Sequence, residues 1–331
     1  MSQPKPLNLR KISELCGFST CTVSRVLSGR AREFRITETT EKEILRVARA
    51  AGYRPNYLAH SLNTGRTHTI GLLFANRVDN YLGAILDGVE ARLRGTPNRI
   101  VMATCENDPR ILREEIDAFS YRQVEGIIVY PLAHFAGEPK TAAKIRTPEL
   151  PTVIIGRKGT WDTDEVMLND QQAGLTAARR ALAAGARTFA IFTNPSDCSS
   201  DRARVESFQG ELIKAGVAAR HMATYEDAAT VGKQAKTLAR ADAFFGTNSG
   251  LLLNVISTLS AQPGFRPTYL GSVGEVEGRP LLKFPIDAIP IPGHELGLQA
   301  ADLMLWRLEH SRDAMRQRRL VDFDMASSLN D

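Results

Sequence analysis

The sequence predicts an α/β protein that consists of a small all-α head and two doubly wound parallel lobes. Three observations lead to this fold class. The first 54 residues carry three helical patterns separated by short turns. From Thr69 onward, continuous apolar runs alternate with helical patterns, which is typical of parallel strands covered on both faces. A chain of 331 residues is also long for a single core, so several packed units are expected.

The head follows the plan of a helix-turn-helix unit. Residues 9–16 place apolar side chains at helical spacing, and Gly17 suits the left-handed turn that ends such a helix. Ser19 is a natural N-cap for a second helix. Thr37 begins a third helix, which supports the other two.

The second helix has a polar outward face. Its apolar stripe, which includes Val23 and Val26, points inward. The side chains that then face away are Thr20, Cys21, Ser24 and Arg25. Small polar residues let a helix approach phosphates closely, and an arginine can pair bidentately with a guanine edge in the major groove. This face therefore predicts DNA recognition, although any small three-helix unit can show the same pattern.

The charge distribution also favours a polyanionic partner for the head. Residues 1–68 hold three lysines and nine arginines against five glutamates, a net charge of +7. The whole chain carries +5, so residues 69–331 carry −2. A basic head on a near-neutral body indicates nucleic acid for the head and a different task for the body. The alternative is a solvated charged surface.

A short helical pattern, "NYLAHSLN", lies between the head and the body and is followed by the polar linker "NTGRT". A helix of this length is not stable alone in water, so we expect it to order on binding. The expected divisions are a head at 1–54, a hinge helix and linker at 55–67, and a body at 68–331.

The body shows nine apolar runs with amphipathic stretches between most of them. The runs lie at 70–75, 99–105, 125–130, 152–156, 165–170, 188–193, 242–247, 268–273 and 287–291, and the helical stretches at 81–94, 109–122, 171–184, 201–215 and 249–260. So many strands predict two doubly wound lobes. A ligand cleft is expected between them, at the carboxyl ends of the strands.

Motifs for catalysis, metal or cofactor binding are missing from the sequence. The four cysteines are scattered and the six histidines form no ligand spacing, so we expect free thiols and no metal or cofactor. No nucleotide-binding or hydrolase motif is present. The start of the chain has no signal-peptide pattern and no run reaches the length of a membrane span, which predicts a soluble cytoplasmic protein.

Four features then occur together: "CGFSTCTVSRVLSG", "AAGYRPNYLAHSLNTGRTHTIGL", the "ELG" at 295–297, and the strand–helix rhythm between them. In this combination the chain resembles, over essentially its whole length, the lactose-repressor type of bacterial transcription regulators, the LacI/GalR family. The resemblance implies a body of the periplasmic-binding-protein type. Its first lobe is expected at about 68–168 and 293–318, and its second lobe at about 169–292 and 319–331.

The resemblance assigns roles to the head residues. Thr20, Cys21 and Arg25 fall where the family reads bases, and Ser19, Thr22 and Ser24 fall at its phosphate contacts. Asn56, Ala59 and Leu62 lie in the matching hinge segment, where the leucine wedges into the minor groove. The loop "GRAREFRIT" is longer than in the lactose repressor. Its Arg30, Arg32 and Arg35 either reach phosphates or are solvated.

The resemblance also implies effector-binding residues in the body, namely Tyr81, Arg157, Arg204, Asn248 and Glu275. Three carboxylates that many members use for neutral sugars are replaced here, at Gly156, Ser249 and Gly274 with Glu275. Two arginines remain, and arginine suits a carboxylate or phosphate. This pattern favours a sugar acid or sugar phosphate. The alternatives are that Arg157 pairs with a protein carboxylate while Glu275 faces solvent, and that Arg204 only braces its loop against Asp197 or Asp201.

Together these features predict a DNA-binding repressor that works as a homodimer on a pseudo-palindromic operator and responds to a small sugar-derived effector. No leucine heptads follow the last apolar segment, "RLVDFDM", so a dimer is expected rather than a tetramer. The alternatives are a cytoplasmic sugar-binding protein or an enzyme on the same fold.

Overall fold

The computed structural model describes residues 8–53, 61, 65–75, 79–132, 148–194, 198–225, 233–235, 238–276, 282–310 and 315–324. The chain divides into two compact units, Met1–Thr67 and His68–Asp331, here called the head and the body. Each is described by itself.

The head contains three helices, each started by a polar side chain. They are α1 (Leu9–Cys16), α2 (Thr20–Leu27) and α3 (Glu38–Ala50). The caps Asn8, Ser19 and Thr37 accept hydrogen bonds from the backbone three residues ahead, which satisfies a free N–H group of each first turn. The expected helix-turn-helix plan is confirmed.

A small apolar cluster holds the three helices of the head together. It consists of Ile12, Val23, Val26, Ala31, Ile44 and Ala48. Leu15, which shares the helical spacing of α1, is instead 53% exposed. The core of the head is therefore built from one residue of α1 and two residues of each of the other helices, with Ala31 from the loop between them.

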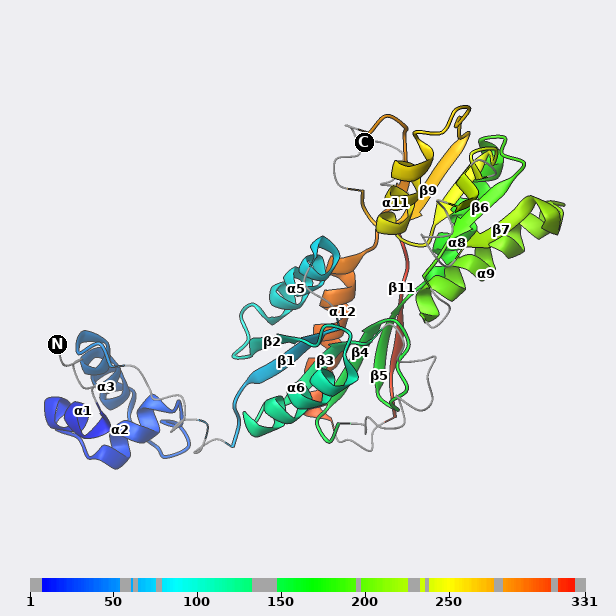
Figure 1. Cartoon of the computed structure of the whole chain (residues 1–331). Helices are drawn as coiled ribbons and strands as arrows, with labels where there is room; N and C mark the ends of the chain where they lie inside the picture. Colours follow the sequence, from blue (N-terminus) through cyan, green and yellow to red (C-terminus); the bar gives the residue numbers. More distant parts are fainter. Residues whose placement is uncertain are drawn as a thin grey trace. The chain divides into compact units, whose positions relative to one another are not determined.

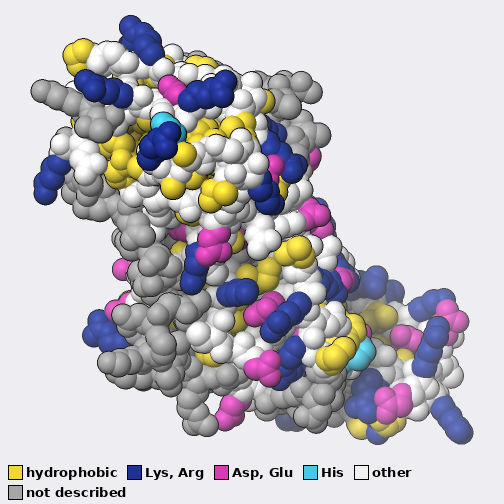
Figure 2. Space-filling view, turned by 90° about the vertical axis from the view of Figure 1, so that its right-hand side faces the viewer, with side chains coloured by type: hydrophobic (Ala, Val, Ile, Leu, Met, Phe, Trp, Pro, Cys, Tyr) yellow, Lys and Arg dark blue, Asp and Glu magenta, His cyan; other side chains and the backbone are white. Residues whose placement is uncertain are grey.

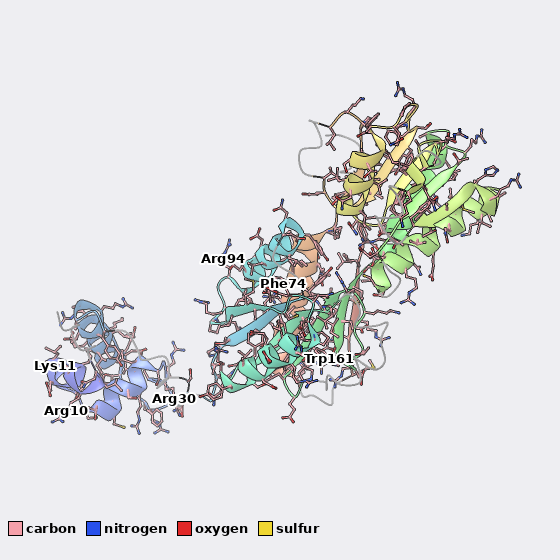
Figure 3. All side chains as sticks on the ribbon, in the orientation of Figure 1. Arg10, Lys11, Arg30, Phe74, Arg94 and Trp161 are labelled. Carbon is pink, nitrogen blue, oxygen red and sulfur yellow. The ribbon has the colours of Figure 1, made fainter. Side chains whose placement is uncertain are left out.

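The first lobe of the body is a six-stranded parallel sheet in the order β11-β5-β4-β3-β1-β2 (Figure 1). Its strands are β1 (Thr69–Phe74), β2 (Arg99–Thr104), β3 (Gly126–Tyr130), β4 (Thr152–Gly156), β5 (Asp164–Leu168) and β11 (Arg318–Val321). Its helices are α5 (Asn80–Leu93), α6 (Pro109–Tyr121) and α12 (Gly293–Glu309). Phe74 and Trp161, labelled in Figure 3, are buried in this lobe.

Helices α5 and α12 approach each other unusually closely in the first lobe. A Cβ atom on Gly297 would lie 2.1 Å from the carbonyl oxygen of Ile85, a distance that no side chain can occupy. The "ELG" stretch therefore supplies the contact point between two helices that are about 200 residues apart in the sequence.

The second lobe is a five-stranded parallel sheet in the order β10-β9-β8-β6-β7. Its strands are β6 (Phe189–Phe192), β7 (Met222–Tyr225), β8 (Ala243–Gly246), β9 (Tyr269–Val273) and β10 (Asp287–Ile289). Its helices are α8 (Asp170–Ala183), α9 (Ser199–Lys214) and α11 (Ser249–Leu259), with the short η1 (Ala219–His221) before β7. Figure 1 shows the two sheets as separate units of the body.

Two details differ from the expectation. The edge strand β7 was not predicted, because "MATY" is short and only partly buried. The boundary expected at residue 319 was also wrong, since β11 pairs with β5 through Val321 and completes the first sheet. The chain reaches the second lobe only afterwards, where the N–H of Phe323 donates to the side chain of Gln172 in α8 at 2.9 Å.

Candidate functional site

The outward face of α2 is the first candidate site. Ser19, Thr20 and Cys21 are exposed, while Thr22, Ser24 and Arg25 are half-buried. The Ser19 hydroxyl accepts the N–H of Thr22 at 3.1 Å and lies 2.8 Å from the Thr22 hydroxyl. Six of the residues expected at DNA therefore lie on one short helix and its cap.

The loop between α2 and α3 carries the other basic residues of this surface. The guanidinium carbon of Arg25 lies 3.9 Å from the ring centroid of Phe34. Arg30 donates two hydrogen bonds to Glu33, from Nε at 2.7 Å and Nη2 at 2.6 Å. Arg35 is exposed and has a positive φ of 51°. Asn56, Ala59 and Leu62 lie outside the described residues.

The second candidate site is a cavity of about 490 Å³ in the body. It opens where the carboxyl ends of strands from both sheets meet, which is where doubly wound folds bind ligands. All five residues expected to bind the effector line it. The other residues that the site uses are Tyr130, Gly156, Asn194 and Asp201.

Arg204 lines this cavity and is already paired with a carboxylate of the protein. Its Nε and Nη2 donate to one carboxylate oxygen of Asp170 at 2.8 and 2.7 Å, and its Nη1 donates to the carbonyl of Thr247 at 2.7 Å. Arg204 is 5% exposed and Asp170 is 7% exposed. The pair therefore keeps Arg204 rigid and compensates its charge, while its terminal nitrogens retain N–H groups for a ligand.

Asp170 was not anticipated as the partner of Arg204. The sequence had suggested Asp197, which lies outside the described residues, or Asp201. Asp201 instead accepts a hydrogen bond from Asn194 at 2.8 Å. Asp170 had been assigned to a strand ending, but β5 stops at Leu168 and Asn169 caps α8. An "ND" pair between a buried strand and a helix is the signal that could have identified this position.

Arg157 differs from Arg204 because it faces a neutral partner. Its Nη2 donates to the hydroxyl of Tyr130, and its guanidinium carbon lies 4.3 Å from the centroid of that ring. Its Nε is buried without a hydrogen-bond partner among the described residues. Nor does any carboxylate of the described part of the chain lie within salt-bridge distance of Arg157. The alternative that Arg157 pairs with a protein carboxylate thus finds no support.

Gly156 makes room for the contact between Arg157 and Tyr130. Its φ is 78°, and a Cβ atom there would lie 2.8 Å from the Tyr130 ring and 3.2 Å from the Tyr81 hydroxyl. An aspartate would be strained and would push the ring away. A glycine in place of an aspartate at this position is therefore needed for Tyr130 to contact Arg157.

Tyr81 and Tyr130 form an edge-to-face pair with ring centroids 5.9 Å apart. Burial raises the pKa of both hydroxyls above the ordinary tyrosine value, so both stay protonated at neutral pH. The Tyr81 hydroxyl is buried and has no hydrogen-bond partner among the described residues. Tyr81 also lines the cavity.

The remaining two expected residues have more limited roles. The side-chain oxygen of Asn248 accepts the N–H of Leu251 at 2.9 Å and so caps α11. Glu275 is exposed at the rim of the cavity. In the described part of the chain no cluster of side chains suits a metal ion, and no helix there has the length and apolarity to cross a membrane.

Comparison with known proteins reveals similar chains of full length. No family model matches the chain. It is 28% identical over 321 residues to the HTH-type transcriptional regulator PtxS of Pseudomonas aeruginosa, covering 94% of this chain and 92% of that one. It is 23% identical over 326 residues to the ribose operon repressor of Escherichia coli, covering 94% and 96%.

Solved structures show the same fold. The lac repressor dimer bound to operator and the anti-inducer ONPF matches with a TM-score of 0.79 at 15% identity, covering 97% of both chains. The Cra regulator of Pseudomonas putida in complex with fructose 1-phosphate matches with a TM-score of 0.66 at 20% identity, over 78% of this chain and 98% of that one.

One chain carries a helix-turn-helix head and a two-lobed body with a polar cavity, and these relatives, which it matches over 92% and 96% of their length, are transcription regulators rather than enzymes. The chain is thus similar over nearly its whole length to bacterial transcription regulators, and it shares the fold of solved LacI-family regulators.

Proposed function

We propose that the protein is a repressor whose operator affinity is controlled by an anionic sugar derivative, a sugar acid or a sugar phosphate, bound in the cavity of the body. It acts as a homodimer on a pseudo-palindromic operator, with residues 1–54 reading DNA and residues 55–67 serving as the hinge. The similarity to PtxS and to the ribose operon repressor supports control of transcription.

The contacts of Arg157 carry the proposal about the effector. A largely buried guanidinium is costly unless a carboxylate or phosphate compensates it. Its partner in the protein is the neutral Tyr130, and its buried Nε has no hydrogen-bond partner among the described residues. A ligand carboxylate or phosphate bound beside Arg157 would compensate this charge and gain charge-assisted hydrogen bonds from the guanidinium.

Other residues that line the cavity suit the hydroxyls of a sugar. The buried carboxylate of Asp201 accepts from Asn194 and keeps further acceptor capacity. Asn194 and Asn248 provide amide groups at the ends of β6 and β8. A ligand with an anionic end at Arg157 and hydroxyls toward Asp201 would therefore satisfy both the guanidinium and the polar side chains of the site.

A paired ligand screen tests the effector class. Each neutral sugar is compared with its aldonic acid and with its phosphate ester in a thermal-shift assay on the full chain. We expect only anionic members to raise the unfolding midpoint, because a ligand that binds only the folded state stabilises it. Calorimetry with the best ligand should show that Arg157→Met abolishes binding.

Lys158→Met is the matched control, because Lys158 is an exposed neighbouring cation outside the cavity lining. It should bind the same ligand with wild-type affinity. Neutral sugars that bind as tightly as their acids, together with an Arg157→Met variant of unchanged affinity, would rule out the anionic effector.

A gel-shift competition tests the role of the head in reading DNA. DNA from upstream of the protein's own gene serves as the probe. Arg25→Ala should lose about 1–3 kcal/mol of discrimination between specific and unrelated DNA, which is typical of one bidentate arginine–guanine contact. Arg49→Ala removes the same charge from an exposed position on α3 and should keep the discrimination. Unchanged sequence preference in Arg25→Ala would refute the base-reading role.

A further inference from the structure

The loop that follows α2 contributes an aromatic surface to the DNA-binding face. Arg25, in the last turn of α2, places its guanidinium carbon 3.9 Å from the ring centroid of Phe34. At this distance the cation lies in contact with the π face of the ring. The family resemblance and the charge pattern of the head assign no role to Phe34.

The backbone of this loop fixes the position of Phe34. The N–H of Ile36 donates to the carbonyl of Ala31 at 2.9 Å, and the N–H of Phe34 donates to the carbonyl of Arg30 at 3.3 Å. Ala31 is 1% exposed and belongs to the apolar cluster of the head. The backbone that carries Phe34 is therefore tied to the core at Ala31, and this tie fixes the point from which the ring extends.

A second arginine lies over the same ring but is neutralised. The guanidinium carbon of Arg30, which is labelled in Figure 3, lies 5.0 Å from the Phe34 centroid. Glu33 binds Arg30 through two hydrogen bonds, and this contact, together with the more distant charge of Arg25, lowers the pKa of the Glu33 carboxyl. Of the two arginines at the ring, Arg25 is thus the one with no hydrogen-bonded carboxylate among the described residues.

We infer that Phe34 is a positioning residue for base recognition, holding the guanidinium of Arg25 in a fixed orientation before DNA arrives. This inference rests on the proposed base-reading role of Arg25. An arginine that is free to rotate loses conformational freedom when it forms a bidentate contact, and stacking on a fixed ring removes part of that loss in advance. A loosely held arginine also reaches phosphates of any sequence, so the ring favours specific over nonspecific contacts.

The test uses the full chain and a duplex of defined origin. The probe is the consensus that the wild-type protein selects from a randomised pseudo-palindromic library. The comparison duplex differs from it at one base pair, namely the one that wild-type protein prefers and the Arg25→Ala variant no longer distinguishes. Phe34→Leu keeps an apolar side chain without a π face, and we expect it to lower the affinity ratio of the two duplexes roughly two- to five-fold. Phe34→Tyr keeps the face and should preserve the ratio.

Two further measurements separate positioning from packing. In the Arg25→Ala background, Phe34→Leu should have no additional effect on the ratio. Replacing Phe34 with its fluorinated analogues keeps the volume and weakens the π face, so the ratio should fall as fluorine atoms are added, even if Phe34→Leu does not fold. The dependence of nonspecific binding on salt should stay unchanged, because the number of phosphate contacts is the same.

The inference is overturned if fluorination leaves the ratio unchanged, or if Phe34→Leu lowers the ratio equally with and without Arg25. If one of these results is found while the Arg25→Ala variant loses its base preference, only the positioning role of Phe34 is refuted. An Arg25→Ala variant that keeps its base preference refutes the base-reading role as well.

Discussion

The described ion pairs of the head are all exposed, whereas the body combines exposed pairs with two that are buried. In the head, Lys42–Glu38 and Arg46–Glu43 join residues three or four positions apart, and the side chains of both pairs are 44–78% exposed. In the body, Arg204–Asp170 and Arg307–Asp164 join distant segments, and their side chains are 1–8% exposed. Figure 2 shows Lys and Arg beside Asp and Glu on the visible surface of the molecule.

This difference between exposed and buried ion pairs corresponds to the two expected partners, a polyanion for the head and a small molecule for the body. Exposed charges are screened by salt and can exchange neighbours, which suits reversible contact with a polyanion by a head of net charge +7. Buried charges depend on one partner in one geometry, which suits recognition of a single small molecule. Four experiments test this contrast between the head and the body.

The largest effect is expected for Asp170→Ala in the body. Arg204 would then be buried without its counter-charge, which costs about 3–5 kcal/mol of unfolding free energy. Both tryptophans, Trp161 and Trp306, lie in the body, so tryptophan fluorescence during urea unfolding reports on this unit. The double variant Asp170→Leu with Arg204→Met should recover much of the loss. A single variant as stable as wild type would show that Arg204 does not depend on this pair.

The next effect concerns alkaline pH. Because burial raises the pKa of Tyr81, the unfolded chain loses this proton at a lower pH than the folded one. Stability is thus fully present below pH ~10 and falls above it, by up to about 1.4 kcal/mol per pH unit for each such tyrosine. Tyr81→Phe should flatten the decline measured by unfolding at successive pH values. Tyr121, which is 90% exposed, is the control, and Tyr121→Phe should leave the slope unchanged.

A smaller effect is expected in the head, where Ser19 both caps α2 and is proposed to contact phosphate. Ser19→Ala should destabilise α2 by about 1 kcal/mol, measured by hydrogen exchange of its amides. Ser19→Asp keeps the cap but adds a negative charge, so α2 should remain stable while DNA affinity falls. Equal DNA affinity of Ser19→Asp and wild type would contradict the phosphate contact.

The smallest effect is expected for Glu43→Ala, which removes the carboxylate from the exposed pair with Arg46. Because both groups are in water before and after unfolding, stability measured by thermal denaturation should stay at the wild-type value. A loss comparable to that of Asp170→Ala would break the contrast between the head and the body.

Most of the fold follows from local patterns in the sequence. The nine predicted apolar runs all contain strands, because buried parallel strands are continuous apolar segments bounded by turns. The head was also predictable, since its caps and its glycine turn are local signals. The partly buried β7 and the exact end of β11 were not, because edge strands are defined by their neighbours rather than by their own composition.

The candidate sites were predictable in location but only partly in their contacts. The expected effector residues all reached the cavity because strand ends meet at one edge of a parallel sheet. The partner of Arg204 was missed because Asp170 lies 34 positions away in the sequence. The ring beneath Arg25 was missed because spacing cannot reveal how a loop folds back onto a helix.

Asn169 lies where the chain passes from β5 of the first lobe to α8 of the second lobe, next to the cavity. The N–H of Asn169 donates to the carbonyl of Val321 at 2.9 Å, and its side-chain nitrogen donates to Asp322 at 2.8 Å, so two of the chain's connections are fastened together there. The next residue, Asp170, grips Arg204. The carboxylate that holds Arg204 therefore lies only one residue from Asn169, where the two connections are joined. Because the two residues are adjacent, a change in the backbone at Asn169 would displace the carboxylate that holds Arg204, and a displacement of Arg204 would act on the same backbone.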